Sequence, residues 1–217
     1  METSPRIADG PAPGGREPSV ETSAVSAEES DAALVERLRR RDPRAFDAVY
    51  ARYHGRLWSF LVRLAGRREV AEDLIQETWM QVARYAEKLN EDTDLRAWLF
   101  TVARNRHRSH RRWAMLGWGA GEVLTVEPVD PAPGLEVVAS ARAAVRSVEE
   151  GLRALPEAHR EVLLLSAVEG LDAAQVGAVL GIREDAARKR LSRARAELAV
   201  WLEKREAEGA GSVGGRR

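Results

Sequence analysis

The sequence predicts an all-α protein in which two small helical domains are joined by a flexible linker. Apolar residues recur at intervals of three and four through most of residues 31–204, which is the spacing of one face of a helix. Strand-like alternation and hairpin turn signals are absent from the sequence. With 217 residues, 44% of them apolar, the chain can form one large core or two small ones.

Residues 1–30 predict a disordered N-terminal arm, because they are rich in Pro, Gly, Ser, Ala and Glu and hold almost no large apolar side chain. This arm has no apolar stretch typical of a secretory signal, and the apolar run 162–168 is far too short to span a bilayer. Cysteine is absent, which excludes disulfides and thiolate metal sites. We therefore expect a cytoplasmic protein without membrane insertion.

Residues 31–113 predict a first domain of amphipathic helices. One helix covers 46–64 and ends near Gly66, because Gly is common just after a helix. A second helix covers about 70–89, and a third begins near Asp94 or Leu95.

The third helix concentrates positive charge in a chain whose formal net charge is zero. Its segment TVARNRHRSHRRW, 101–113, has five arginines, two histidines and no carboxylate. At about 100° per residue, one face of the helix holds the apolar residues Leu95, Trp98, Val102 and Trp113. The opposite face holds Arg104, Arg108, Arg111 and Arg112, and Arg106 on the apolar side does not fit this pattern. The arginine face is either solvated or, as we expect, bound to a polyanion.

Residues 114–134, rich in Gly and Pro, predict a flexible linker, because a structureless connection of about 20 residues is unusual inside one domain. Residues 114–141 carry four acids and no Lys or Arg, so this linker is acidic. Helical spacing resumes in 135–204, which predicts a second domain, and 205–217 predict a disordered tail.

The second domain contains a helix-turn-helix pattern in residues 170–198. Asp172 and Gln175 form a predicted capping box, and Gly181 marks a short turn. The helix after the turn is basic on its outer side through Arg188, Lys189, Arg190, Arg193 and Arg195. A basic second helix favours DNA binding, whereas an ordinary helical hairpin with a solvated face is the alternative.

With these segments in place, residues 31–204 resemble an extracytoplasmic-function sigma factor, a two-domain class of the sigma-70 family of bacterial RNA polymerase sigma subunits. Residues 34–66 are similar to region 2.1, 71–89 to region 2.2, 95–113 to regions 2.3 and 2.4, and 152–198 to region 4. The region 2.2 hallmark is Asp-x-x-Gln-Glu followed by an aromatic, here Asp73, Gln76, Glu77 and Trp79.

The resemblance implies a role for each of these segments in promoter-specific transcription initiation. Region 2.2 implies docking of Asp73, Gln76, Glu77 and Trp79 on core RNA polymerase, a complex of subunits that include β and β′, through the β′ clamp helices. Regions 2.3 and 2.4 imply melting and binding of the −10 element by Trp98, Arg104, Asn105, Arg108, Arg111 and Arg112. Asn105 matches the family position that lines a pocket for a flipped base, and the arginines would neutralise phosphates.

Region 4 implies −35 recognition, with Arg188, Lys189 and Arg190 on the DNA and Arg193 and Arg195 on phosphates. The sequence departs from the family at Asp185, which replaces a usual Gly, and the loop 88–98 lacks a common glycine. The promoter sequence is therefore not implied. An anti-sigma factor is a further partner that the resemblance implies, and the acidic linker either passes near nascent RNA or serves solubility.

Two other classes of function are weighed against this reading. A stand-alone helix-turn-helix regulator would not need the edge 71–79, and a helical adaptor for proteins would not need two basic helices. An enzyme is not expected, because the histidines His54, His107, His110 and His159 are scattered and form no catalytic spacing. His107 and His110 could share a metal, but the sequence shows no third ligand, so no cofactor is expected.

Overall fold

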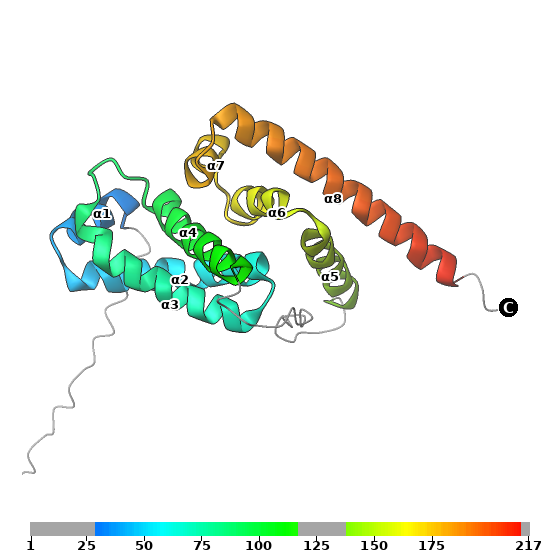
Figure 1. Cartoon of the computed structure of the whole chain (residues 1–217), viewed down its shortest axis with the longest axis horizontal. Coiled ribbons are helices and arrows are strands. Elements are labelled where there is room, and N and C mark those ends of the chain that lie inside the picture. Colours follow the sequence, from blue (N-terminus) through cyan, green and yellow to red (C-terminus); the bar gives the residue numbers. More distant parts are fainter. Residues whose placement is uncertain (1–28, 117–137, 214–217) are drawn as a thin grey trace, which may run out of the picture.

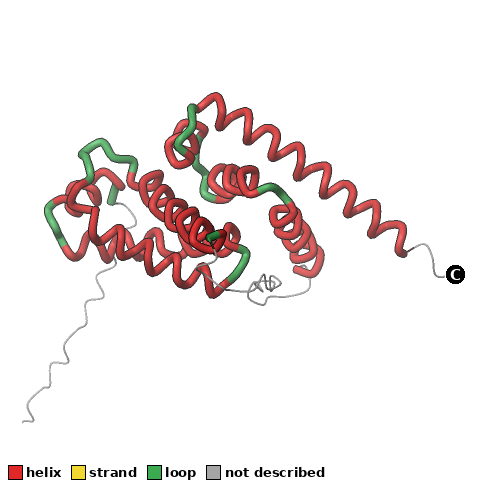
Figure 2. The backbone as a smooth tube through the Cα atoms, viewed as in Figure 1, coloured by secondary structure: helices red, strands yellow, loops and turns green. Residues whose placement is uncertain are grey.

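The computed structural model describes residues 29–116 and 138–213, which we call the first half and the second half. Every regular element in these two ranges is helical (Figure 2). This finding confirms the all-α class. Within the described ranges, no helix has the length and apolar character needed to cross a membrane.

The first half consists of four α-helices and one short 3-10 turn. They are α1 (Asp31–Arg39), α2 (Pro43–Ala65), α3 (Arg68–Tyr85), η1 (Ala86–Lys88) and α4 (Leu95–Met115). Short polar side chains start three of them: Ser30, Asp42 and Asp94 each accept a hydrogen bond from a backbone N–H in the first turn. Gly66, with φ of 72°, ends α2 as the sequence predicts.

The second half contains the predicted helix-turn-helix. Its elements are α5 (Val138–Ala154), α6 (Glu157–Leu163), the π-helical turn η2 (Leu164–Val168), α7 (Ala173–Leu180) and α8 (Glu184–Val213). Asp172 and Gln175 form the capping box at the start of α7, and Gly181, with φ of 66°, ends the helix. Helix α8 therefore begins three residues after the turn glycine.

Each half has apolar side chains buried among its own helices. In the first half, the rings of Phe60 on α2 and Phe100 on α4 meet edge to face at 5.3 Å between centroids. In the second half, Leu164, Leu165 and Leu171 are almost completely buried. The same two halves also pack on one another, because α4 contacts α7 and α2 contacts α6 and η2 (Figure 1).

The domain boundaries stay predictions, although some residues at their edges differ from expectation. Glu29 and Ser30, assigned to the arm, contact or cap α1, and α4 continues to Met115 inside the predicted linker. Helix α8 continues to Val213, well into the predicted tail, because Ala, Glu, Lys and Arg in 199–208 are strong helix formers. Residues 1–28, 117–137 and 214–217 lie outside the described residues.

Candidate polymerase and nucleic-acid interfaces

The outer edge of α3 presents the three polar residues of the Asp-x-x-Gln-Glu motif. Asp73, Gln76 and Glu77 are all exposed. Because they are spaced by three and four residues, they lie on one side of the helix. Met80, one turn further on, is 61% exposed and extends this edge with an apolar side chain. The edge is thus acidic at one end and apolar at the other.

Trp79 faces the opposite way and fixes α3 against α2. Its side chain is 7% exposed, and its indole Nε1–H donates to Nδ1 of His54 at 3.1 Å. The ring also packs edge to face on Phe46 at 5.7 Å and against Tyr50 at 4.8 Å between centroids. The fourth residue of the motif therefore positions the exposed three.

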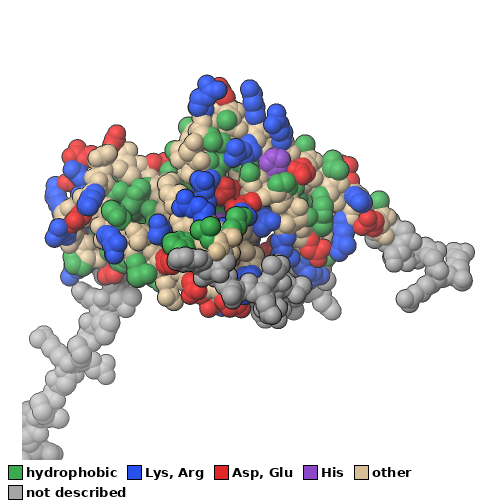
Figure 3. All heavy atoms as spheres, in the orientation of Figure 1, with side chains coloured by type: hydrophobic (Ala, Val, Ile, Leu, Met, Phe, Trp, Pro, Cys, Tyr) green, Lys and Arg blue, Asp and Glu red, His purple; other side chains and the backbone are tan. Residues whose placement is uncertain are grey.

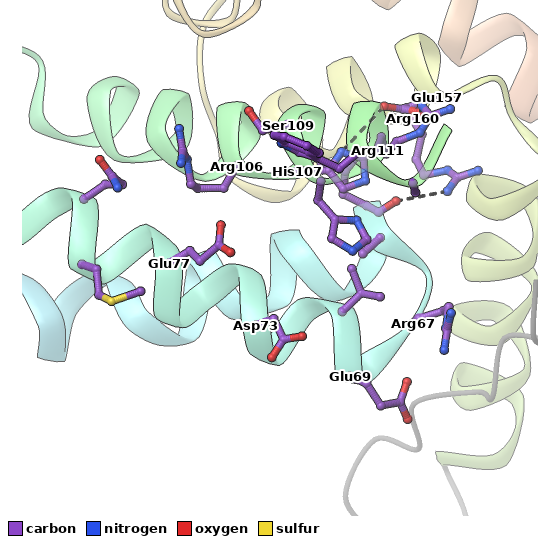
Figure 4. Close-up of a pocket in the computed structure, with 18 residues that line it drawn as sticks. Arg67, Glu69, Asp73, Glu77, Arg106, His107, Ser109, Arg111, Glu157 and Arg160 are labelled. Atoms are coloured by element: carbon purple, nitrogen blue, oxygen red, sulfur yellow. Dashed lines mark hydrogen bonds and ion pairs between the residues drawn. The ribbon is translucent and has the colours of Figure 1, made fainter. Parts of the chain in front are cut away.

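A groove of about 1010 Å³ runs between α3 and the C-terminal part of α4. Asp73 and Glu77 of α3 line one wall and Arg106 of α4 lines the other, while Glu157 and Arg160 of the second half lie at one end (Figure 4). This groove was not predicted from the sequence. Arg106 was the clue to it in the sequence, because an arginine on the apolar side does not fit a helix with one apolar face.

The exposed face of α4 gathers three of the predicted −10 residues. Asn105, Arg108 and Arg112 are exposed and line a small pocket of about 320 Å³ together with Arg106 and Ser109. The Arg112 guanidinium donates to Oγ of Ser109 at 3.2 Å. An amide flanked by guanidinium groups can pair with a base edge while the cations contact the adjoining phosphates.

Trp98 lies near the start of the same helix, partly buried against the core of the first half. It is less exposed than Asn105, Arg108 and Arg112. Trp98 was predicted on the apolar face of this helix, and its partial burial agrees with that prediction.

The expectation that α4 has a single packed face is wrong. The residues that are buried on α4 include Leu99, Phe100, Ala103, Arg104 and His107, whereas the predicted core residue Trp113 is 54% exposed. The buried arc is rotated by roughly a third of a turn from the predicted one. The physical reason is that α4 packs on two sides, against α2 and α3 of its own half and against α7 of the second half.

Arg104 and Arg111 both pair with glutamates of the second half, but only Arg104 is buried, whereas Arg111 stays exposed like Arg108 and Arg112. Arg104 is 7% exposed, and its Nε and second guanidinium nitrogen donate to the two carboxylate oxygens of Glu161 at 3.1 and 3.3 Å. Arg111 is ion-paired with Glu157. The predicted exposure of Arg104 is therefore wrong in this arrangement of the halves.

His107 is the buried centre of this ion-pair cluster. It is 3% exposed, and its Nδ1 has no hydrogen-bond partner in the described structure, with the nearest Glu157 oxygen 3.7 Å away. Burial, the largest cause, acts together with the positive charge of Arg111 and of other neighbouring basic groups to lower the pKa of His107 to about 4. His107 is accordingly neutral at pH 7.

Possible metal-ligand atoms of His107, Glu157 and Glu161 lie within 4.8 Å of one another. From the sequence, His107 and His110 were the possible metal pair, and no third ligand was evident. Both carboxylates, however, already pair with arginines, Glu161 with Arg104 and Glu157 with Arg111. A divalent cation would have to displace those guanidinium groups, so the cluster is built as an ion-pair network.

Four of the five basic residues predicted on α8 are exposed. Arg188, Lys189, Arg193 and Arg195 are solvent-exposed, and Arg190 is half-buried. Figure 3 shows Lys and Arg side chains gathered at the top of the view, where α8 begins. Arg188 is paired with Glu184 one turn before it, so a phosphate would compete with that carboxylate. Ala187 and Ala194 are buried on the inner side of the helix.

Comparisons with known proteins agree with this geometry. The family model of sigma-70 region 2 matches residues 49–114, and that of sigma-70 region 4 matches residues 146–198. The RNA polymerase sigma factor CarQ of Myxococcus xanthus is 32% identical over 180 residues, which cover 80% of this chain and 98% of CarQ. The ECF RNA polymerase sigma factor SigL of Mycobacterium tuberculosis is 31% identical over 157 residues, or 72% of this chain and 88% of SigL.

A solved structure has the same fold. The sigma factor RpoE of Bartonella quintana, crystallised with the anti-sigma factor NepR, aligns with a TM-score of 0.61 and 25% identity over 73% of this chain and 96% of RpoE. Both halves of the chain thus match sigma factor regions in the expected order, with the region 2 edge exposed on α3 and a basic helix-turn-helix in region 4. The chain belongs to the extracytoplasmic-function group of the sigma-70 family, RNA polymerase sigma factors that direct transcription initiation.

Proposed function

We propose that this chain acts in the cytoplasm, without catalysis of its own, and confers promoter specificity on core RNA polymerase through three separate surfaces. These are the α3 edge for the polymerase, the exposed face of α4 for the −10 element and the outer side of α8 for the −35 element. One observation supports the proposal most directly. The acidic edge from Asp73 to Glu77 and the face formed by Asn105, Arg108 and Arg112 are separate surfaces of the same domain.

The α3 edge suits a protein partner rather than DNA. Asp73 and Glu77 would repel phosphates, whereas their carboxylates can pair with basic side chains and Gln76 can both donate and accept hydrogen bonds. Met80 adds an exposed apolar contact next to them. We assign this edge to the β′ clamp helices of core polymerase, as the resemblance to region 2.2 implies.

The α4 face suits a single strand with one base turned out. Asn105 lies at a small pocket whose other walls include two exposed arginines, Arg108 and Arg112. Turning a base out of the stack costs a few kcal/mol and is easiest at a melted step, so a polar pocket beside cations is the arrangement required. Trp98 offers an aromatic surface near the start of the same helix.

The α8 surface suits duplex DNA, because its N-terminal turns follow the short turn of a helix-turn-helix. Glu184 and Asp185 place two acids in the first turn of α8. They favour the helix dipole and disfavour close phosphate approach at that end. We therefore assign base contacts to Arg188, Lys189 and Arg190 and phosphate contacts to Arg193 and Arg195.

An anti-sigma protein is a proposed further partner. The similar sigma factor RpoE was solved in complex with the anti-sigma factor NepR. The groove between α3 and α4, about 1010 Å³ in volume and lined by both polar and apolar side chains, offers a site for a helix of such a partner. Binding there would cover Asp73 and Glu77, which line the groove.

The test is binding to purified core polymerase, followed by transcription from a promoter library. The double change Asp73→Arg and Gln76→Ala should weaken core binding by at least tenfold and leave helix content unchanged. Asp47→Arg is the matched control, because it reverses an exposed acid on α2, away from the α3 edge. Equal core affinity of all three proteins would refute the assignment of the α3 edge. DNA binding without core would instead favour the stand-alone regulator.

A further inference from the structure

The N-terminal end of α8 places two acids inside a basic surface. The Ala187 N–H donates to the Arg183 carbonyl oxygen at 3.0 Å, so the helix begins directly after Arg183. Glu184 and Asp185 are therefore its first two residues, and both are exposed. Acidic and basic side chains lie together at the top of the view in Figure 3, where α8 begins. Carboxylates at this position need an explanation, because the same surface is assigned to DNA.

The two acids differ in what they contact. Glu184 is ion-paired with Arg188 on the next turn of the helix. The Asp185 side chain makes no hydrogen bond or ion pair with any residue in the described ranges, although Arg188 and Lys189 follow it by three and four residues. The acceptor capacity of the Asp185 carboxylate is therefore not used within the described protein, whereas that of Glu184 is partly satisfied.

The rotation of α8 about its axis points Asp185 directly outward. Ala187 and Ala194 are 1% and 0% exposed, and they define the inner side of the helix. At 100° per residue, Asp185 lies about 160° around the axis from Ala187, whereas Glu184 lies only about 60° from it. Lys189 is also about 160° from Ala187, on the other side. Asp185 is thus the first residue of the outermost line of the helix, and Glu184 lies on its flank.

A carboxylate at this position suits the edges of the bases and not the DNA backbone. The second helix of a helix-turn-helix lies in the major groove with its N-terminal residues over the base edges. A helix N-terminus ordinarily attracts a phosphate, but Glu184 and Asp185 repel one. The outward direction of Asp185 and this repulsion therefore agree, because both place its carboxylate over the floor of the groove, away from the phosphates.

The chemistry of the carboxylate selects one base. An ionised carboxylate only accepts hydrogen bonds, so it needs a donor on the base edge. In the major groove, cytosine presents the N4 amino group, whereas guanine presents only the acceptors N7 and O6 and thymine the acceptor O4. Adenine presents its N6 amino group beside the acceptor N7, which repels a carboxylate. Cytosine is therefore the best partner, and thymine and guanine leave the carboxylate desolvated and unpaired.

We propose that Asp185 is a specificity-determining residue of the −35 contact, where it accepts a hydrogen bond from the N4 amino group of one cytosine and disfavours thymine and guanine at that position. The inference rests on the proposed function, because it takes α8 as the helix that contacts the −35 element. It adds a base-edge acceptor to the donors Arg188, Lys189 and Arg190. The −35 preference of this chain then depends on an acid as well as on its basic residues.

The test compares holoenzymes made from the whole chain and core polymerase on duplex promoters with a constant −10 element and each base pair at each −35 position. The unchanged chain should bind about tenfold more tightly to cytosine than to thymine at one position, which is within the range that one base-edge contact supplies. Asp185→Asn has the same shape, but its amide both donates and accepts. This variant should move the preference at that position from cytosine to adenine, whose N6 and N7 pair with an amide.

Glu184→Gln is the matched control, because it removes the same charge from the same turn. It should strengthen binding to all promoters similarly and keep the preference for cytosine at that position.

Asp185→Ala should lose the preference at that position and keep those at the other positions. Circular dichroism and thermal unfolding check that all variants fold. A common −35 preference of the unchanged chain, Asp185→Asn and Asp185→Ala would overturn the inference and leave Asp185 a role in the helix dipole only. An equal shift of base preference by Glu184→Gln would also overturn it, as a general effect of charge. Failure of the proposed function is distinguishable, since the holoenzyme would then show no core-dependent promoter binding on any sequence, and the inference would fall with it.

Discussion

The backbone of Gly177 on α7 lies against Ile182, so that a Cβ atom on Gly177 would come within 2.8 Å of the Ile182 carbonyl oxygen. The atom that would be struck belongs to the backbone of the turn between α7 and α8 and cannot rotate away. The Gly177 carbonyl oxygen also accepts a hydrogen bond from the Ile182 N–H at 2.9 Å. The absence of a side chain at this position thus sets how closely α7 approaches the turn of the helix-turn-helix.

Gly177→Ala should destabilise region 4 by about 1–3 kcal/mol, which is the usual cost of forcing extra atoms into a packed site. Gly55→Ala is the control, because a Cβ there meets nothing within 4 Å and Gly55 lies inside α2. That change should stabilise region 2 by up to about 1 kcal/mol, the difference in helix propensity between Gly and Ala. Thermal unfolding of both variants measures the two signs, and a stabilising Gly177→Ala would contradict the geometry.

Mild acid should open the contact between the halves through His107. The pKa of His107 is about 4 in the closed state, below the ordinary value of 6.5 that a solvated imidazole has. The open state therefore binds the extra proton, and the closed state loses stability as pH falls from about 6.5 toward 4, by up to tenfold in population per pH unit. The charged groups around His107 are Arg104, His110, Arg111, Glu157, Arg160 and Glu161.

The raised pKa of Glu169 acts in the opposite direction, because its protonation at the acid end favours the closed state. His107→Gln isolates the histidine contribution by removing the titrating ring and keeping a polar side chain. Dyes attached at Ala83→Cys on α3 and Ala199→Cys on α8, both exposed positions in a chain without native cysteine, report the contact between the halves by energy transfer. Recorded from pH 7.5 to 4.5, the energy transfer should fall more steeply for the chain with His107 than for His107→Gln. Identical profiles for the two proteins would show that His107 does not control the opening.

The exposed arginines of α4 should determine salt dependence rather than sequence preference. Replacing Arg108 and Arg112 by Ala should reduce the slope of log affinity against log salt by about 1–1.5, since each single-strand phosphate contact contributes about 0.7. The loss should be similar for every −10 sequence. Holoenzyme binding to −10 strands over a salt series measures the slope, and an altered base preference would contradict a phosphate role.

Asn105→Ala should behave in the opposite way. The change removes a base-edge partner and no charge, so the salt slope should hold. Discrimination should fall at one base of the −10 element by roughly 1–3 kcal/mol. The same holoenzyme assay, with each base placed at each position, identifies that base. A uniform loss over all positions would mean that Asn105 supports the pocket without reading a base.

Features that depend on neighbours in the sequence could be predicted, and those that depend on distant segments could not. The capping box of Asp172 and Gln175 and the end of α2 at Gly66 are local, and both are present as predicted. The partner of Arg104 is Glu161, 57 residues away across the predicted linker, so no helical wheel could place Arg104 in an interface. The groove between α3 and α4 was not predicted for the same reason, because its lining includes Glu157 and Arg160 of the second half.

The exposed and basic character of α8 was predictable, because its inward Ala187 and Ala194 are spaced by seven residues. The pairing of Arg188 with Glu184 was open to the same reasoning, since the two are four residues apart. The motif 73–79 was found by resemblance, and burial of Trp79 against α2 gives it a physical basis.

Helix α8 is one uninterrupted element from Glu184 to Val213, about 45 Å long at 1.5 Å per residue. Near its middle it bears on α5, where Leu198 and Trp201 lie directly over Gly151. Because α8 also packs on α6 and α7, the helix-turn-helix would turn with it: a tilt of about 10° about Gly151 would move the N-terminal end of α8, roughly 20 Å away, by about 3–4 Å. This displacement equals about one base step of DNA. A force on the C-terminal end of α8 can therefore shift the register in which its N-terminal end meets the promoter.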